Sequence, residues 1–308
     1  MPHLDEDTVA ALLDPDEVAD VTAQVFAELG RGEAATTVRV RARTPGAMAS
    51  AMAAAVPSLG VTGGKVYATV DGRFTFHVVL FDLEGRVLCT LDGGPLTDVR
   101  TPALSAVAID HLARPGARTA AVLGTGRAAR PHLEMLARRL PLDEVRVWGR
   151  RSDAAAALAA AGEAAGAPVT VADTAEAAVD GVDVVVTVTS ANEPVVDADA
   201  IADHALVCAV GATKPERCEL DPQLFARAAA VVTDSIEGAP AECGDLQHAV
   251  AAGTFAWDRL VDLADLLAGR VEVPRAGIAG PVVFETQGVA IQDVAAGALV
   301  WRRHQART

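Results

Sequence analysis

Apolar residues in the second half of the chain gather in short runs at residues 120–123, 145–148, 169–172, 183–189, 205–210 and 229–233. The last three of these runs show no regular polar alternation. Continuous apolar runs are typical of strands that are covered on both faces of a sheet. Between the first runs lie segments whose apolar residues recur at helical spacing. The pattern predicts an α/β fold, with a Rossmann-type doubly wound parallel sheet from Thr119 to about Ile278.

A glycine turn follows the first of these runs, and a helical pattern with Ala129, Leu133 and Leu136 follows the turn. Glycine lets a ligand approach the backbone closely. The free N–H groups at the start of a helix bind a pyrophosphate. We therefore expect a dinucleotide to contact five consecutive residues here, with Ala129 as the small third residue of a GxGxxG-type turn. They are Gly124, Thr125, Gly126, Arg127 and Ala128.

The next strand of the pattern ends in Gly149-Arg150-Arg151-Ser152, with no acidic residue. An NAD site usually places Asp or Glu there to hold the ribose 2′-hydroxyl. Two arginines fit a 2′-phosphate instead, so we expect NADPH rather than NADH. The alternative is that an arginine only solvates the strand end.

Ligands of such sheets bind beyond the carboxyl ends of the strands. The rim of the expected crevice therefore includes Thr189, Ser190 and the segment 211–213. We count Val210 and Gly288 among the cofactor contacts as well.

The first half of the chain has a different pattern. A helical stretch at residues 5–29 precedes strand-like stretches at 37–43, 64–70, 74–81 and 87–91. Several strands with little helix between them indicate an α+β segment. A further helix is expected to begin near Thr101-Pro102, with Arg100 at its N-terminus, and a last one at 288–302. We expect two domains: 1–116 with 288–308, and 117–287.

Charge and composition exclude several classes of protein. The chain has 308 residues and a net charge of −15, which argues against nucleic acid or anionic membrane as a partner. Its four cysteines form no CxxC pair and have no zinc-type spacing, so we expect no metal. The N-terminus has no basic signal-peptide region, and the apolar stretch at 45–61 is too short for a bilayer. We expect a cytoplasmic protein.

Several segments occur in the order found in one family. They are LTDVRTPALSAVA, VLGTGRAA, VRVWGRR, VVVTVTSANEPV, AVGATKPERCELD, VVTDS, ECGDL and FETQGVAIQDV. The chain resembles the ornithine cyclodeaminase/mu-crystallin family over nearly its whole length. The resemblance implies an α+β domain that forms a homodimer, a Rossmann domain, and a C-terminal helix that returns to the first domain. It implies substrates that are amino acids or related imines, with hydride moving at the carbon that bears nitrogen.

The resemblance also implies a carboxylate-binding cluster of Arg39, Lys65 and Arg100. Arginine offers a carboxylate a bidentate fork, and Lys65 supplies a point charge. The proton for the substrate nitrogen is expected to come from Lys65 or from a water held by Thr213. Arg41 is an alternative to Arg39, because it lies two residues away on the same strand face. Thr213 stands where cyclodeaminases carry Asp, and a hydroxyl is no base near neutral pH. This favours the mu-crystallin branch, where NADPH-dependent ketimine reduction is known.

The sequence therefore predicts NADPH-dependent reduction of an imine to an α-amino acid, or the reverse dehydrogenation. The catalytic set is Arg39, Lys65, Arg100 and Thr213. Two alternatives stay open: a cyclodeaminase with bound NAD, and a non-catalytic protein that binds NADPH and a ligand. Departures from the family pattern near Met52 and at Thr286-Gln287 leave the substrate side chain unidentified. His77 is expected to be a structural histidine rather than a pocket residue.

Overall fold

The computed structural model describes residues 1–277 and 279–307, so Ile278 and Thr308, which end two of the expected ranges, lie outside it. The chain divides into two compact units. Unit 1 comprises Met1–Leu104, Ala264–Arg270 and Gly288–Thr308, and unit 2 comprises Ser105–Leu263 and Val271–Gln287. The first division falls inside helix α3 (Gly93–Leu112).

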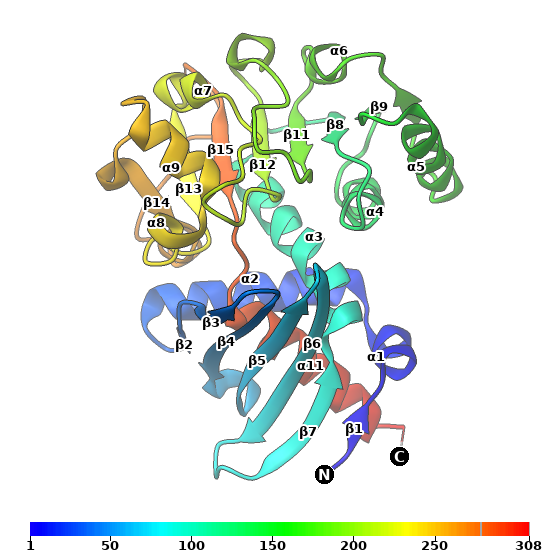
Figure 1. The fold of residues 1–308 in the computed structure, drawn as a ribbon, viewed down its shortest axis with the longest axis vertical. Helices are drawn as coiled ribbons and strands as arrows, with labels where there is room; N and C mark the ends of the chain where they lie inside the picture. Colours follow the sequence, from blue (N-terminus) through cyan, green and yellow to red (C-terminus); the bar gives the residue numbers. More distant parts are fainter. Residues whose placement is uncertain (278, 308) are drawn as a thin grey trace. The chain divides into compact units, whose positions relative to one another are not determined.

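Unit 2 is built on an eight-stranded sheet whose strands are all parallel (Figure 1). Its order is β10 (Val169–Val171), β9 (Glu144–Trp148), β8 (Thr119–Leu123), β11 (Val184–Thr187), β12 (Leu206–Ala209), β15 (Val282–Glu285), β13 (Ala230–Thr233) and β14 (Leu260–Asp262). From β8 the chain winds first through β9 and β10 and then, in the other direction, through β11 and β12. The expected doubly wound α/β fold is confirmed, and the reversal of strand order places a switch point between β8 and β11.

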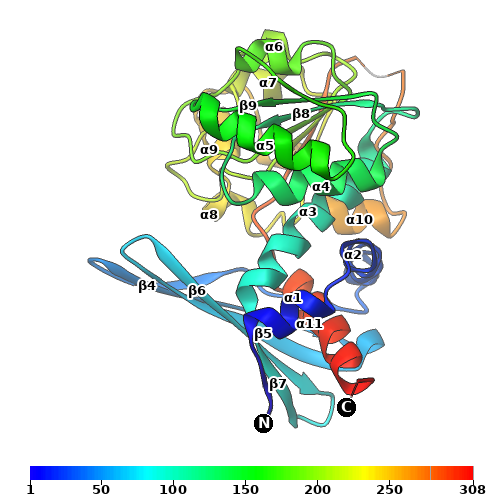
Figure 2. The same ribbon diagram turned by 90° about the vertical axis from the view of Figure 1, so that its right-hand side faces the viewer.

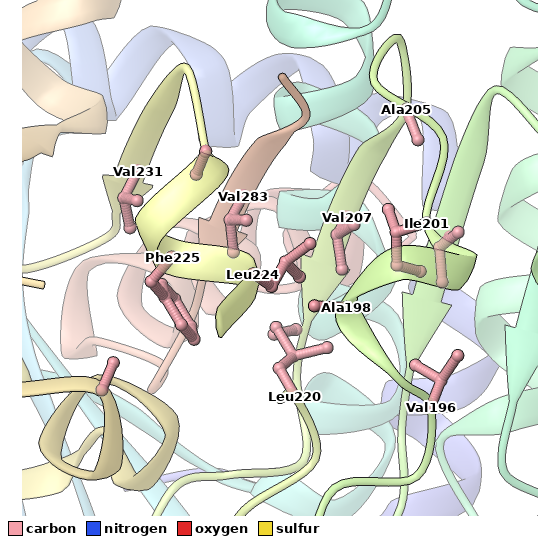
Figure 3. Packing of buried hydrophobic residues seen from close by; sticks show 14 of the residues in the cluster. Val196, Ala198, Ile201, Ala205, Val207, Leu220, Leu224, Phe225, Val231 and Val283 are labelled. Atoms are coloured by element: carbon pink, nitrogen blue, oxygen red, sulfur yellow. The ribbon is translucent and has the colours of Figure 1, made fainter. Parts of the chain in front are cut away.

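Short helices connect these strands. They are α4 (Ala129–Arg139), α5 (Ser152–Ala164), α6 (Ala175–Val179), α7 (Pro222–Arg227), α8 (Ala239–Glu242) and α9 (Gly244–Ala251), with 3₁₀ turns at Ala198–Ala200 and Trp257–Arg259. In Figure 3, Leu224 and Phe225 of α7 pack with Val207, Val231 and Val283 of three strands, and all five side chains are fully buried. Burial of each such side chain stabilises the fold by about 1.5–3 kcal/mol.

Unit 1 contains a seven-stranded sheet in the order β1 (His3–Leu4), β7 (Val87–Asp92), β6 (Arg73–Asp82), β5 (Val61–Val70), β4 (Ala47–Val56) and β2 (Ala35–Thr36), with β3 (Val40–Thr44) also paired to β4. The chain around β4 was expected only to be an apolar stretch, but it forms a ten-residue strand whose side chains alternate in burial. A 3₁₀ turn at Pro57–Leu59 leads from β4 to β5.

The helices of unit 1 cover one face of this sheet (Figure 2). Helices α1 (Glu6–Leu12) and α11 (Ala290–Gln305) lie on the sheet, α2 (Pro15–Arg31) packs on α11, and α10 (Leu263–Leu267) lies beside α2. The C-terminal helix α11 packs on β4, β5 and β6 within unit 1. Leu80 and Leu91 of the sheet lie against Gly297 of α11, where an added Cβ would make ordinary van der Waals contacts with them at 3.5 and 3.6 Å. The side chain of Asp14 caps α2 by accepting hydrogen bonds from the backbone N–H groups of Asp16 and Glu17.

Helix α3 corrects one expectation from the sequence. It begins at Gly93 rather than near Thr101, so Pro102 lies inside the helix and Arg100 lies on its third turn. An internal proline costs about 3 kcal/mol because it removes one hydrogen bond of the helix. Neighbours such as Leu104 and Val107 are buried, and their burial is worth more than this cost. The expectation that Arg100 lies at the N-terminus of a helix is therefore wrong.

Among the described residues, no helix is long and apolar enough to cross a membrane. The described histidine, cysteine and carboxylate side chains form no group that could hold a metal ion. The four cysteines are buried free thiols. Burial raises the pKa of Cys89 and of Cys208 to about 12, which makes both thiols poor nucleophiles.

Candidate functional site

A cavity of about 850 Å³ opens at the carboxyl ends of β8, β11 and β12 in unit 2. Ten of the eleven residues expected to contact the cofactor line it. They are Gly124, Thr125, Gly126, Arg127, Ala128, Arg150, Arg151, Thr189, Ser190 and Val210. The eleventh, Gly288, lies in unit 1 beside Arg39 and Arg100. The cavity has the position that dinucleotides take in doubly wound sheets.

Gly124 and Gly126 of the turn are glycine for different physical reasons. Gly124 has a φ of 121°, and a Cβ there would lie 2.8 Å from the carbonyl oxygen of Val188, so the fold itself requires glycine. At Gly126 a Cβ would meet only the same oxygen, at 4.0 Å. The fold therefore leaves open space at Gly126, on the side where a bound molecule would lie.

The end of the cavity that lies after β9 is suited to an anion. A Cβ at Gly149 would lie 2.5 Å from Cγ2 of Thr125, so the second strand end and the glycine turn approach each other closely. Arg150 is exposed, and the guanidinium of Arg151 lies 4.0 Å from Asp153 with 74% of its side chain accessible. Ser152 is the first residue of α5, and the residue before it makes no side-chain cap. The N–H groups at the start of α5 are thus available to an anion.

Glu219 holds the backbone of two residues that line this cavity, Thr189 and Gly211, and the sequence pattern predicted no role for it. Its carboxylate accepts hydrogen bonds from the backbone N–H of Thr189, the backbone N–H of Gly211 at 2.7 Å and the hydroxyl of Thr187 at 3.0 Å. These three hydrogen bonds, which we call the Glu219 clamp, hold the ends of β11 and β12 together. Burial raises the pKa of Glu219, and these three donors lower it in part. The only signal in the sequence was its place in the segment ERCELD.

Two further carboxyl groups lie in the same buried region. Asp245 accepts hydrogen bonds from the backbone N–H groups of Glu219 and Leu220, and burial together with the Glu219 charge raises its pKa to about 7. Burial and the Asp245 charge raise the pKa of Glu285 well above its usual value. A proton held by either of these two carboxyl groups lowers the negative charge beside Glu219.

Lys65 occupies the centre of a second site, in unit 1. Its side chain points to the helix-covered side of β5 and is only 1% exposed. The ammonium donates to the hydroxyl of Thr97 at 2.7 Å and to Oδ1 of Asp293 at 2.9 Å. An ammonium has three N–H groups, so one is left for a further acceptor. The ring of Phe76 lies 4.5 Å from Nζ.

Arg39 and Arg100 complete this cluster. Arg100 donates from Nη1 to Oε1 of Gln292 at 2.7 Å, and its Nε lies 3.5 Å from Oδ1 of Asp293. Arg39 donates from Nη2 to the carbonyl oxygen of Gly288 at 2.7 Å. The structure thus brings Arg39, Lys65 and Arg100 to the N-terminal turn of α11, with Asp293 among them. Arg41 lies on β3 and is half-buried like Arg39, so burial does not distinguish the two arginines.

Asp293 is the member of this cluster that the sequence reading missed, although it stands in the segment FETQGVAIQDV. Burial opposes its ionisation, but Lys65, Arg100 and Arg39 together lower its pKa below the usual value. Burial lowers the pKa of Lys65 to about 8, with Asp293 opposing that shift. Within the described chain, Oδ2 of Asp293 and Nε2 of Gln292 are buried without a hydrogen-bond partner. Buried groups of this kind favour a ligand that satisfies them.

Thr213 and His77 lie outside the contacts of both the cavity in unit 2 and the cluster around Lys65. Thr213 does not line the cavity in the described part of unit 2, and its backbone N–H donates to the carbonyl of Gly211 at 3.0 Å. Its catalytic role stays a prediction. His77 lies 3.2 Å from Asp92 on the exposed face of the unit 1 sheet, in agreement with a structural role.

The parallel sheet, the switch point and the glycine turn define a Rossmann-type fold of the dinucleotide-binding class. The chain belongs to the ornithine cyclodeaminase/mu-crystallin family, whose model matches residues 7–308.

Two curated relatives and one solved structure illustrate the similarity. The ketimine reductase mu-crystallin of Mus musculus is 34% identical over 225 residues, which are 73% of this chain and 68% of the relative. The Delta(1)-pyrroline-2-carboxylate reductase of Bacillus cereus is 33% identical over 84% of this chain and 83% of its own length. The iminosuccinate reductase of Paracoccus denitrificans, solved with NAD⁺, is 27% identical with a TM-score of 0.93, over 100% of this chain and 97% of the other.

Proposed function

We propose that this protein reduces the imine of a 2-oxo acid to an α-amino acid with NADPH, and that it can run the reverse dehydrogenation. The observation that carries the proposal is the buried cluster at Asp293. Arg39, Lys65 and Arg100 contribute three positive charges and Asp293 one negative charge, so the ionised cluster has a net charge of +2. A buried excess of positive charge favours an anionic ligand, and a carboxylate fits the arginine forks.

The enzyme class follows from the family. The relatives include reductases that act on C=N bonds, and the chain is an oxidoreductase of this NAD(P)-dependent kind. A bound nicotinamide cofactor supplies the hydride for the imine carbon. The chain's own residues hold the carboxylate and deliver a proton to the imine nitrogen. A pKa of about 8 lets Lys65 carry that proton at neutral pH and release it readily.

The preference for NADPH is supported by the strand end in unit 2. Arg150 and Arg151 are exposed at the cavity rim, and no acidic residue stands between Gly149 and Ser152 to hold a ribose hydroxyl. Each charge-assisted contact to a 2′-phosphate is worth about 1.5–3 kcal/mol. We expect NADPH to bind at least about tenfold more tightly than NADH, and replacement of both arginines by alanine to abolish the difference.

A homodimer is supported by the uncovered face of the unit 1 sheet. Val40, Val66 and Val70 lie on that face with 62%, 54% and 50% of their surface exposed. Alanines of β4 lie beside them. A contiguous apolar face of this kind marks an interaction surface, and we infer that a second copy covers it. Static light scattering should give the mass of a dimer, and a monomer mass would contradict the inference.

The experiment that tests the function is a screen of NADPH oxidation. Cyclic imines with a carboxylate, and 2-oxo acids mixed with ammonia or methylamine, are offered to the purified protein. Reduction that is lost in Lys65→Ala supports the proposal, and a Lys65→Ala variant with full kcat and KM refutes the role of Lys65. Release of ammonia from ornithine with NAD would favour the cyclodeaminase alternative. Binding of NADPH without any turnover would favour the non-catalytic one.

A further inference from the structure

An aromatic patch lies beside the carboxylate cluster, on the same face of the same sheet. Lys65 and Tyr67 alternate along β5, and Phe74 and Phe76 alternate along β6. The register pairs Tyr67 with Phe76, so these side chains share the face that carries Lys65. The tight connection at residues 71–72 keeps the two strands paired to their ends. We refer to Tyr67, Phe74 and Phe76 as the aromatic patch.

The patch begins at the cations and extends away from them. The Phe76 ring centre is 4.5 Å from Nζ of Lys65, and the Tyr67 ring centre is 6.0 Å from Cζ of Arg39. Tyr67 and Phe76 have ring centres 5.2 Å apart, and Phe74 stacks on Phe76 at 5.6 Å. Exposure rises along this series, since Tyr67 is buried at 8% whereas Phe74 is 48% exposed.

This arrangement is unusual for the composition of the chain. The sequence has one tyrosine and seven phenylalanines, and the tyrosine and two of the phenylalanines meet here. An exposed phenylalanine gains when an apolar group covers it, and aromatic rings prefer to stack on one another. A half-exposed ring stacked outward from a carboxylate-binding cluster is therefore suited to the side chain of a bound amino or imino acid.

The charge of the neighbouring cluster restricts that side chain further. Its net charge of +2 repels an ammonium group at the far end of a substrate, which disfavours ornithine-like or lysine-like molecules. A second carboxylate would lose its hydration against three aromatic rings. An uncharged aromatic side chain avoids both costs and gains ring stacking.

We propose that the aromatic patch binds the substrate side chain, and that the preferred substrates are imines of 2-oxo acids with an aromatic side chain. The proposal rests on the proposed function, because the carboxylate of the same substrate must occupy the cluster of Arg39, Lys65 and Arg100. Phe74 is the residue that selects the side chain, since its ring is the exposed end of the patch.

The first test compares two imines formed with methylamine, one from phenylpyruvate and one from pyruvate. We expect kcat/KM with NADPH to be at least about tenfold higher for the phenylpyruvate imine. Phe74→Ala should lower that value at least about fivefold and leave the pyruvate imine within about twofold of wild type. Leu83→Ala is the matched control, because Leu83 is 52% exposed in the turn after β6 and lies outside the patch. It should change neither substrate.

A second measurement needs no turnover. In the presence of NADP⁺, L-phenylalanine should raise the melting temperature of the wild type more than L-alanine does, and Phe74→Ala should remove the difference. If no imine is reduced but this difference is seen, the proposed function fails and the side-chain site stands. If imines are reduced with no preference for the aromatic one, or if Phe74→Ala affects both imines equally, the side-chain site is refuted. A Phe74→Ala protein that changes from dimer to monomer would also refute it, since the patch would then be a subunit contact.

Discussion

Replacement of Asp293 by Asn removes the negative charge beside Lys65 and keeps the size of the side chain. The two side chains are buried, and Nζ of Lys65 lies 2.9 Å from Oδ1 of Asp293. The other charges near Lys65 belong to Arg100 of α3 and to Arg39, and both act against its protonated form. Asp293 is therefore the group that keeps Lys65 charged in a buried position.

The size of the effect follows from the distance. Two unit charges 2.9 Å apart attract by about 6 kcal/mol at an effective dielectric constant of about 20. The amide oxygen of Asn still accepts a hydrogen bond, so we take about half of this attraction, 3 kcal/mol, as lost. About 1.4 kcal/mol corresponds to one pH unit in a titration. The pKa of Lys65, about 8 in the wild type, should then fall by about two in Asp293→Asn.

The assay is the pH dependence of kcat/KM for imine reduction. A proton donor must be protonated, so activity is lost as pH rises through the pKa of Lys65. We expect kcat/KM to fall at high pH with a midpoint, the alkaline limb, near pH 8 in the wild type. In Asp293→Asn this midpoint should lie about two pH units lower. At pH 7 the protonated fraction of Lys65 falls from about nine-tenths to one-tenth, so kcat/KM should drop about tenfold. Glu33→Gln is the control, because it removes an exposed carboxylate of unit 1 that pairs with Arg31.

The result that would refute this reasoning is an unmoved alkaline limb in a folded Asp293→Asn protein. Loss of one partner of a buried ion pair costs about 3–5 kcal/mol of stability, so circular dichroism must show that the variant is folded at the assay temperature. Lower activity at every pH with an unchanged limb would indicate a purely structural role for Asp293.

Three further outcomes are expected. Gly126→Ala should keep the wild-type melting temperature, because a Cβ there meets no atom of the fold closer than 4.0 Å, but should raise the Kd for NADPH about tenfold or more by crowding the ligand, as measured by NADPH fluorescence. Glu219→Gln should raise the same Kd at least about fivefold, because an amide nitrogen cannot accept from the pocket N–H groups, whereas the exposed neighbour Glu216→Gln should not. Burial lowers the pKa of His132 of α4 to about 4, so its contribution to stability is full above pH 6.5 and is lost as pH falls towards 4. In urea unfolding, the free energy of unfolding of the wild type should therefore decrease between these pH values by about 3 kcal/mol more than that of His132→Asn.

Local patterns predicted much of the fold. The unbroken apolar runs identified the main strands of the parallel sheet, because a strand buried on both faces has no polar alternation. The sequence missed β14, which has three residues, and β4, whose alanines and methionines resemble no typical strand. It also misplaced the start of α3, because proline normally marks a helix boundary and burial outweighed that preference here.

The sequence by itself determined the sites whose residues are close together in the chain. A strand, a glycine turn and a helix in immediate succession are typical of one local structure, so the glycine turn at the cavity and the two arginines after the next strand could be predicted from the sequence. The tertiary structure decided what depends on distant pairs. Lys65 and Asp293 are 228 positions apart, and Arg100 and Gln292 are 192 apart. No periodicity links such residues; packing of α11 on the sheet of unit 1 brings them together, and only then does burial set the charge and the pKa of Lys65.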